Sequence, residues 1–117
     1  FENIGQTNDT HAAINFISPI NCEDINIKVL NNEIIKSYML FRIDETNNDL
    51  QSFNCIINEN CMINCSGKYY IKNSTKYSIN AKNNYYGTSN VEEDKFLGSI
   101  DYSNYYTDLY DKINEVL

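Results

Sequence analysis

Apolar and polar residues alternate in short runs that return at a fixed interval along the chain. Each run starts with an apolar residue, and the four starts are Phe1, Ile27, Phe53 and Ile79. Alternation with a period of two is typical of a β-strand that buries one face. The even spacing of the starts, at about 26 residues, indicates an internal repeat. The pattern therefore predicts one strand of this kind in every repeat.

Two further series keep the same interval. A polar corner follows each strand start by five residues, at Gln6, Asn32, Asn58 and Asn84. Asparagine suits a tight corner because it tolerates the left-handed backbone region and bonds its own backbone. A second strand per repeat is predicted from the pair Ile14 with Leu40 and the series Ile17, Ile43 and Tyr69.

A period of this length with short strands and Asn-rich corners predicts an all-β solenoid, namely a right-handed parallel β-helix of about 26 residues per rung. Leucine-rich repeats have similar lengths, but their Leu-x-x-Leu-x-Leu spacing is absent here. The alternation and the β-branched and aromatic content exclude helical repeats. We expect rungs over residues 1–87 and a capping segment over 88–117, within one domain of a longer chain. Because Phe1 lies inside a strand, the first rung is expected to be open and able to pair end to end with another chain.

The C-terminal third carries a family resemblance. Residues 83–87 read Asn-Asn-Tyr-Tyr-Gly, and residues 98–106 read Gly-Ser-Ile-Asp-Tyr-Ser-Asn-Tyr-Tyr. This resembles the end of right-handed β-helix repeat proteins of the adhesin-like surface class, over residues 79–109. That family often has Trp in the first motif and Pro-Trp in the second, where this chain has Tyr and Asn-Tyr. The resemblance implies a secreted or cell-surface location.

The expected cap combines aromatic residues and a final helix. Tyr85 and Tyr86 would cover the end of the stack, and Gly87 would turn the chain. Leu109, Ile113 and Leu117 are spaced four apart, which predicts a short amphipathic helix.

The charge balance argues against a nucleic-acid partner, and the lack of a long apolar stretch argues against membrane insertion. The net charge is −7, the pI is near 4.5, and Arg42 is the only arginine. Phosphate backbones need clustered Lys and Arg, so we expect no nucleic-acid partner. No stretch approaches the roughly 20 apolar residues that span a bilayer, so no membrane insertion is expected.

One acidic corner is the best candidate for chemistry. Asp44, Glu45 and Asp49 lie near Arg42. Lyases of the β-helix fold use carboxylates to hold Ca²⁺ and a basic residue to take a proton, so this group is the site of the alternative, enzymatic interpretation. The ordinary explanation is a solvated loop, since Ca²⁺ needs six to eight converging oxygens.

Other residues give little support for catalysis or metal binding. His11 is the only histidine, and the hydrolase motifs of β-helix enzymes are absent. The four cysteines, Cys22, Cys55, Cys61 and Cys65, do not have zinc-ligand spacing. We expect mostly reduced, buried thiols, and disulfide pairing stays open as an alternative. No metal and no cofactor are therefore expected.

The leading hypothesis is a non-catalytic structural or adhesive module that presents tyrosines to a cell-surface glycan or protein. Tyrosine offers contact area with few torsions. The candidate residues are Tyr69, Tyr70, Tyr85, Tyr86 and Tyr105. The alternative is the C-terminal part of a polysaccharide lyase or glycoside hydrolase, with Arg42, Asp44, Glu45 and Asp49 as its site and Ca²⁺ as its ion.

Overall fold

The computed structural model describes residues 12–17, 22–44 and 49–108, and β-strand is almost the only regular secondary structure in them. The strands are β1 (Ile14–Phe16), β2 (Asp24–Leu30), β3 (Glu33–Ile35), β4 (Phe41–Ile43), β5 (Ser52–Asn58), β6 (Cys61–Ile63), β7 (Ile71–Asn73), β8 (Ile79–Asn80), β9 (Phe96–Leu97) and β10 (Ile100–Asp101). One 3₁₀ turn, η1 (Glu93–Lys95), precedes β9. The prediction of an all-β chain is confirmed for the described residues.

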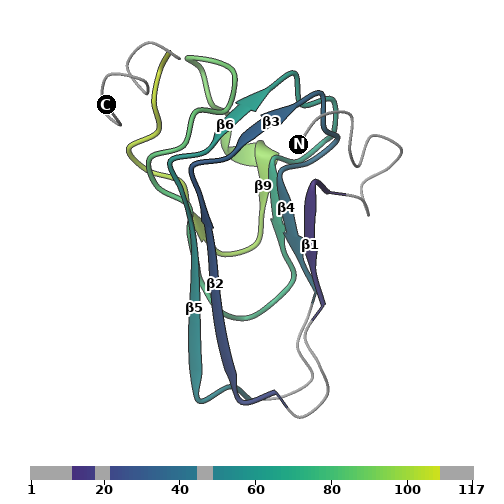
Figure 1. Cartoon of the computed structure of the whole chain (residues 1–117), viewed down its shortest axis with the longest axis vertical. Coiled ribbons are helices and arrows are strands. Elements are labelled where there is room, and N and C mark those ends of the chain that lie inside the picture. Colours follow the sequence, from purple (N-terminus) through teal and green to yellow (C-terminus); the bar gives the residue numbers. More distant parts are fainter. Residues whose placement is uncertain (1–11, 18–21, 45–48, 109–117) are drawn as a thin grey trace.

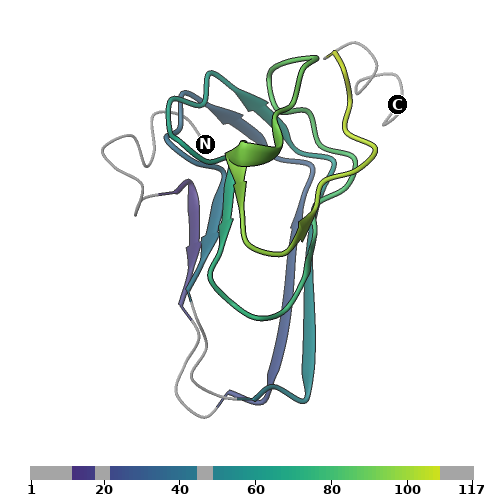
Figure 2. The ribbon, with the colours of Figure 1, turned by 180° about the vertical axis from the view of Figure 1, so that it is seen from behind.

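The strands form three parallel sheets (Figure 1). The first has the order β1-β4-β7-β9, the second β10-β8-β5-β2, and the third pairs β3 with β6. A single bridge from Cys61 to Tyr85 continues the third sheet. Successive strands along the chain therefore enter the three sheets in turn, and neighbours within a sheet come from successive passes of the chain. The sheets do not close into a barrel. Seen from behind, β9 and the segment that follows it form the last pass (Figure 2).

The predicted interval of about 26 residues does not match the register in which β2 pairs with β5. It placed Ile27 opposite Phe53, whereas Ile27 pairs with Cys55. The error is two positions, and a slip of two keeps every side chain on its predicted face. The alternation therefore predicts the buried face of these strands correctly and their pairing partners wrongly.

The spacing between paired strands also changes from one pass to the next. Between β4 and β7, Phe41 pairs with Ile71, which is a longer step than the predicted interval. Between β8 and β10, Ile79 pairs with Ile100, which is a shorter step. No single interval therefore describes the whole stack.

The second predicted strand series is also wrong in its pairing. Ile43 pairs with Phe16 instead of Ile17, which is an error of one position and changes the face, and with Asn73 instead of Tyr69. Ile17 accordingly lies outside the core, with 70% of its surface exposed. In the same sheet the predicted pairing of Ile14 with Leu40 is wrong by one position, because Ile14 pairs with Phe41.

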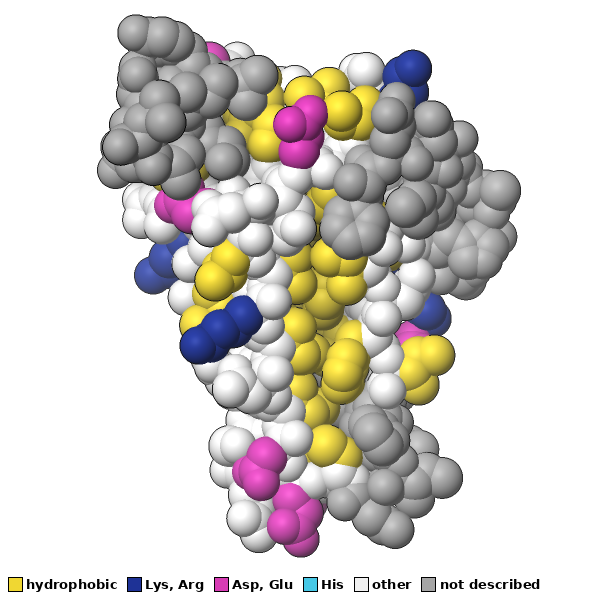
Figure 3. Space-filling view, in the orientation of Figure 1, with side chains coloured by type: hydrophobic (Ala, Val, Ile, Leu, Met, Phe, Trp, Pro, Cys, Tyr) yellow, Lys and Arg dark blue, Asp and Glu magenta, His cyan; other side chains and the backbone are white. Residues whose placement is uncertain are grey.

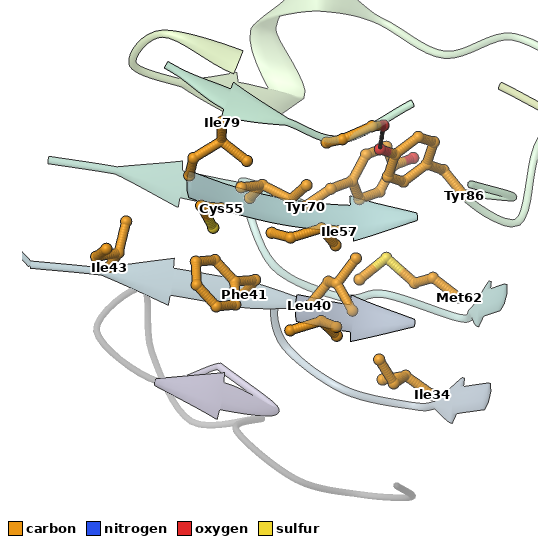
Figure 4. Packing of buried hydrophobic residues seen from close by; sticks show 13 residues of the cluster. Ile34, Leu40, Phe41, Ile43, Cys55, Ile57, Met62, Tyr70, Ile79 and Tyr86 are labelled. Carbon is orange, nitrogen blue, oxygen red and sulfur yellow. Dashed lines mark hydrogen bonds between the residues drawn. The ribbon is translucent and has the colours of Figure 1, made fainter. Parts of the chain in front are cut away.

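The core lies between the three sheets (Figure 4). Phe41, Ile57, Ile71 and Ile79 are completely buried. They come from β4, β5, β7 and β8, so successive passes of the chain add apolar side chains to one core. On the face of Figure 3, hydrophobic side chains form a continuous strip between β2 and β1. The core thus reaches the surface at the end of the stack where the first described strands lie.

The corners between the second and third sheets share one backbone conformation. Asn31, Glu59, Asn83 and Asn104 all have φ between 56° and 61°. Non-glycine residues rarely adopt this region, and Asn does so more readily than most. The prediction of a repeated left-handed corner is confirmed, although its positions lie next to the predicted ones.

Several predictions fall outside the described residues. They concern the strand at Phe1, the corner at Gln6, His11, Glu45 and the terminal helix of residues 109–117. Of the predicted capping segment, β9 and β10 pair with β7 and β8, so they extend the sheets of the earlier passes. Within the described part of the chain, no helix has the length and apolarity to cross a bilayer.

Candidate functional site

A ladder of three asparagines runs through the corners. The backbone N–H of Asn60 donates to Asn84 Oδ1 at 2.9 Å, and the Asn60 side-chain amide donates to the same oxygen at 3.0 Å. Asn32 repeats this arrangement on Asn60 Oδ1, with distances of 3.0 Å and 3.1 Å. Asn60 and Asn84 are completely buried. The ladder therefore joins three passes of the chain from inside.

The sequence interval identified two of the three ladder residues and missed Asn60. It predicted Asn58, whose buried Oδ1 has no hydrogen-bond partner. Asn60 instead donates to the carbonyl oxygens of Val29 and Asn58 at 2.8 Å and 3.1 Å. Two asparagines flank Glu59, and the constant interval selected the one outside the ladder. The shared signal is a polar residue six positions ahead of each ladder asparagine, at Asn26, Asn54 and Ser78.

An aromatic row leads from the core to the last pass of the chain. Tyr70 and Tyr86 stack with ring centroids 5.2 Å apart, and both meet the ring of Phe96 edge to face. Phe96 stacks on Tyr102 at 4.1 Å, and Tyr102 lies 6.4 Å from Tyr105. Tyr102 and Tyr105 are half-buried, so the row reaches the surface at these two rings.

The five tyrosines proposed for binding differ in accessibility. Tyr70 and Tyr86 are 8% and 2% exposed, and burial raises the pKa of both phenols. Their place is the core, because their rings fill the space beside Phe96. Tyr69, Tyr85 and Tyr105 are half-buried, so only these three present a face to a ligand. Lys68 lies over the ring of Tyr69, with its Nζ 5.3 Å from the ring centre.

The described residues of the acidic corner, Arg42, Asp44 and Asp49, do not converge. Arg42 donates to Asp44 at 2.6 Å, whereas Asp49 pairs with Lys76 at an exposed position. The Lys76 ammonium lowers the pKa of Asp49 through a hydrogen bond and its charge. Within the described ranges, no three His, Cys, Asp or Glu side chains come together to hold a metal ion. The geometry of Arg42 and Asp44 is that of an ion pair beside β4.

Two of the four cysteines are buried, in line with the expectation of mostly buried thiols. Cys55 and Cys61 are buried, and Cys65 is half-buried. Cys55 and Cys65 are free thiols. Burial raises the pKa of Cys55 to about 12, and burial also raises the pKa of Cys65. A thiol that stays protonated at neutral pH is a poor nucleophile and a poor metal ligand.

Tyr106, in the last pass of the chain, contacts Glu59 of an earlier pass, and the sequence did not suggest this contact. The hydroxyl of Tyr106 contacts both carboxylate oxygens of Glu59, at 3.0 Å and 2.8 Å. The backbone N–H of Tyr106 donates to the carbonyl oxygen of Asn84 at 2.9 Å. Glu59 and Tyr106 are 47 residues apart, so no short motif could have predicted this pair.

Comparisons with known proteins returned no relative. The sequence matches no protein-family model, and neither a curated protein nor a solved structure was found to be similar to it.

Proposed function

We propose that this chain is a segment of a right-handed parallel β-helix and serves as a structural, adhesive module of a secreted or cell-surface protein. The observation that carries the proposal is that each pass of the chain adds one parallel strand to the first and to the second sheet, and that the first two passes also add one to the third. Crossovers between parallel strands are right-handed in nearly all proteins, which supports the assigned hand. The resemblance of residues 79–109 to adhesin-like β-helix ends supports the adhesive role.

The buried ladder and aromatic row support a stiff scaffold. Strand pairing joins each pass to the next, the Asn32–Asn60–Asn84 ladder joins three passes, and the stacked rings of Tyr70 and Tyr86 add a further contact. Buried polar networks with satisfied hydrogen bonds favour one well-ordered arrangement. A scaffold of this kind keeps surface residues at fixed positions.

The adhesive contact is assigned to the half-buried tyrosines, with Tyr105 as the strongest candidate. Its ring continues the row through Tyr102, which holds it in place. A pre-positioned aromatic ring loses little conformational entropy when a sugar ring or an apolar side chain packs on it. The chemistry that fits is a neutral glycan or a partner protein, since the net charge of −7 disfavours polyanions.

The test is a glycan array combined with a polysaccharide-degradation assay, with and without Ca²⁺. Binding without turnover is expected, and Tyr105→Ala should weaken it about tenfold, which equals about 1.4 kcal/mol. Tyr105→Phe is the matched control and should retain most of the binding. Binding that is unchanged in Tyr105→Ala would remove this residue from the site.

The alternative function is the C-terminal part of a polysaccharide lyase or glycoside hydrolase. The observation that favours it is the Arg42–Asp44 pair beside β4, since the Arg42 Nε is buried without a hydrogen-bond partner. Turnover that depends on Ca²⁺ and is lost in Asp44→Asn would establish the enzyme and overturn the adhesive module.

A further inference from the structure

The chain carries the acceptor pattern for N-linked glycans, Asn-x-Ser/Thr, at three places. The triplets begin at Asn8, Asn64 and Asn73. A glycan is bulky and needs a surface position, so the pattern serves as an acceptor only where its asparagine amide is accessible. Asn8 lies outside the described residues. The fold distinguishes the other two.

Asn64 is accessible in the folded protein. It is exposed at the corner that follows β6, with φ of 59° (Figure 1). Ser66, the third residue of the triplet, is exposed as well. Within the described segments, neither the Asn64 amide nor the Ser66 hydroxyl has a hydrogen-bond partner. The backbone N–H of Ser66 donates to Ser37 O at 3.2 Å, so the main chain is held while both side chains of the triplet are free.

The described residues of the neighbouring passes do not cover Asn64. On one side, Lys36 donates its backbone N–H to Ile63 O at 2.8 Å. On the other side lies Gly87, where a Cβ would be 2.8 Å from a carbonyl oxygen of β6. Gly87 has no side chain that could shield the amide. The strand pairing of β3 with β6 ends at Ile35 and Ile63, so a sugar on Asn64 would interrupt no strand pair.

Asn73 has the same pattern in the opposite surroundings. It is 3% exposed, and its Nδ2 donates to Tyr77 O at 2.7 Å and to Ser99 O at 2.9 Å. Its Oδ1 accepts from the backbone N–H and the hydroxyl of Thr75, at 3.0 Å and 2.7 Å. A sugar on Nδ2 would replace one of the two donated hydrogens. Gly98 leaves no room for it, because even a Cβ there would lie 3.1 Å from the Asn73 Cβ.

We propose that Asn64 is a site of N-linked glycosylation, with a lipid-linked oligosaccharide as the donor. In the transfer, Asn64 Nδ2 forms a bond to the anomeric carbon of the first sugar, the bond from that carbon to the lipid pyrophosphate breaks, and the amide loses one proton. Modification of the natural protein rests on the secreted or cell-surface location proposed above. The ability of the folded chain to accept the glycan does not.

The test combines the purified folded protein with an oligosaccharyltransferase and a lipid-linked oligosaccharide. Peptide N-glycosidase then turns each modified asparagine into aspartate, which peptide mapping by mass spectrometry locates. Asn64 should be modified at least tenfold more than Asn73. Synthetic peptides of residues 60–68 and 69–79, which lack the fold, should both be modified. No transfer to Asn64 of the folded protein, or equal transfer to Asn64 and Asn73, would overturn the proposal.

Ser66→Ala and Ser66→Thr are the matched variants. Ser66 is exposed and its hydroxyl has no partner among the described residues, so both variants should fold. The alanine removes the hydroxyl that the acceptor pattern requires and should lower transfer to Asn64 at least tenfold, whereas the threonine keeps the hydroxyl and should retain it. Undiminished transfer in Ser66→Ala would contradict the assignment.

The protein from its natural source separates failure of the site from failure of the proposed location. A glycan on Asn64 and none on Asn73 is expected there. A bare Asn64 in the natural protein, together with efficient transfer to the purified protein, would refute the modification and count against the secreted or cell-surface location. Failure of transfer to the purified protein would refute the site and leave the proposed location standing.

Discussion

Both polar atoms of the Asn60 side-chain amide are hydrogen-bonded in the interior. Its Nδ2 donates to Val29 O and Asn58 O, and its Oδ1 accepts from Asn32. The repeat interval predicted an asparagine at this corner and missed its position, since the left-handed residue is Glu59 and the ladder residue is its neighbour. The corner residue Glu59 separates two asparagines, and only the hydrogen-bond partners decide which of them enters the ladder.

Replacement of Asn60 by alanine should lower the free energy of unfolding by about 2 to 4 kcal/mol, because the backbone N–H of Asn32 loses its acceptor and the carbonyl oxygens of Val29 and Asn58 lose a donor. Urea denaturation measures the change. Asn54→Ala is the control. It removes one exposed hydrogen bond, from the Asn54 amide to Asn26 Oδ1, and should lower the free energy of unfolding by less than about 1 kcal/mol. Equal losses in the two variants would contradict the assigned role of the interior ladder.

Cys55 should resist alkylation by iodoacetamide at neutral pH. The residue is 2% exposed, and burial raises the pKa of its thiol to about 12. In urea the same thiol should react at once, which peptide mapping by mass spectrometry would show. Rapid modification of Cys55 without denaturant would contradict its place in the core.

The same group makes stability depend on alkaline pH. The unfolded thiol loses its proton near its ordinary pKa of 9.0, whereas the folded thiol keeps it until about pH 12. The unfolded state therefore binds fewer protons in this window, and stability falls as pH rises through it. Burial raises the pKa of Tyr70 and Tyr86 as well, so their effect has the same sign. Cys55→Val should lessen the fall above pH 9.0, measured by urea denaturation at a series of pH values; an unchanged slope would exclude this thiol as its source.

At the scale of elements, the strands are short and depend on tight corners. Alternation predicted strand faces in β2 and β5 because their side chains alternate between core and solvent. The partners could not be predicted from one interval, because loop length differs between passes and so changes the spacing of the paired strands. β9 and β10 have two residues each, which is too short for any periodic signal.

Gly98 shows how closely one corner approaches its neighbour. It has φ of +97°, and a Cβ there would lie 2.0 Å from the carbonyl oxygen of Asn73. Gly98→Ala should therefore lower the midpoint of thermal unfolding by several degrees or more, since both the backbone conformation and the space are unsuited to a side chain. Asn31→Gly is the control, because its φ of 58° suits glycine, and its midpoint should change little. A fully stable Gly98→Ala protein would contradict this corner.

At the scale of the whole molecule, the passes become shorter toward the last strands. Among the described residues, the second sheet therefore has the seven-residue β2 at one side and the two-residue β10 at the other. Of the candidate site, the half-buried tyrosines and the Arg42–Asp44 pair were within reach of sequence reasoning. The aromatic row and the Tyr106–Glu59 contact were not, because they join residues from different passes.

The central claim is that successive passes stack in parallel, with Ile27 of β2 opposite Cys55 of β5. The most direct test is to record nuclear Overhauser effects between backbone protons of these strands in the labelled protein. The account predicts cross-strand contacts of Ile27 with Cys55 and of Val29 with Ile57, together with contacts from the Asn60 side-chain amide to Asn84. Contacts of Ile27 with Phe53, or an antiparallel pattern between the two strands, would contradict it.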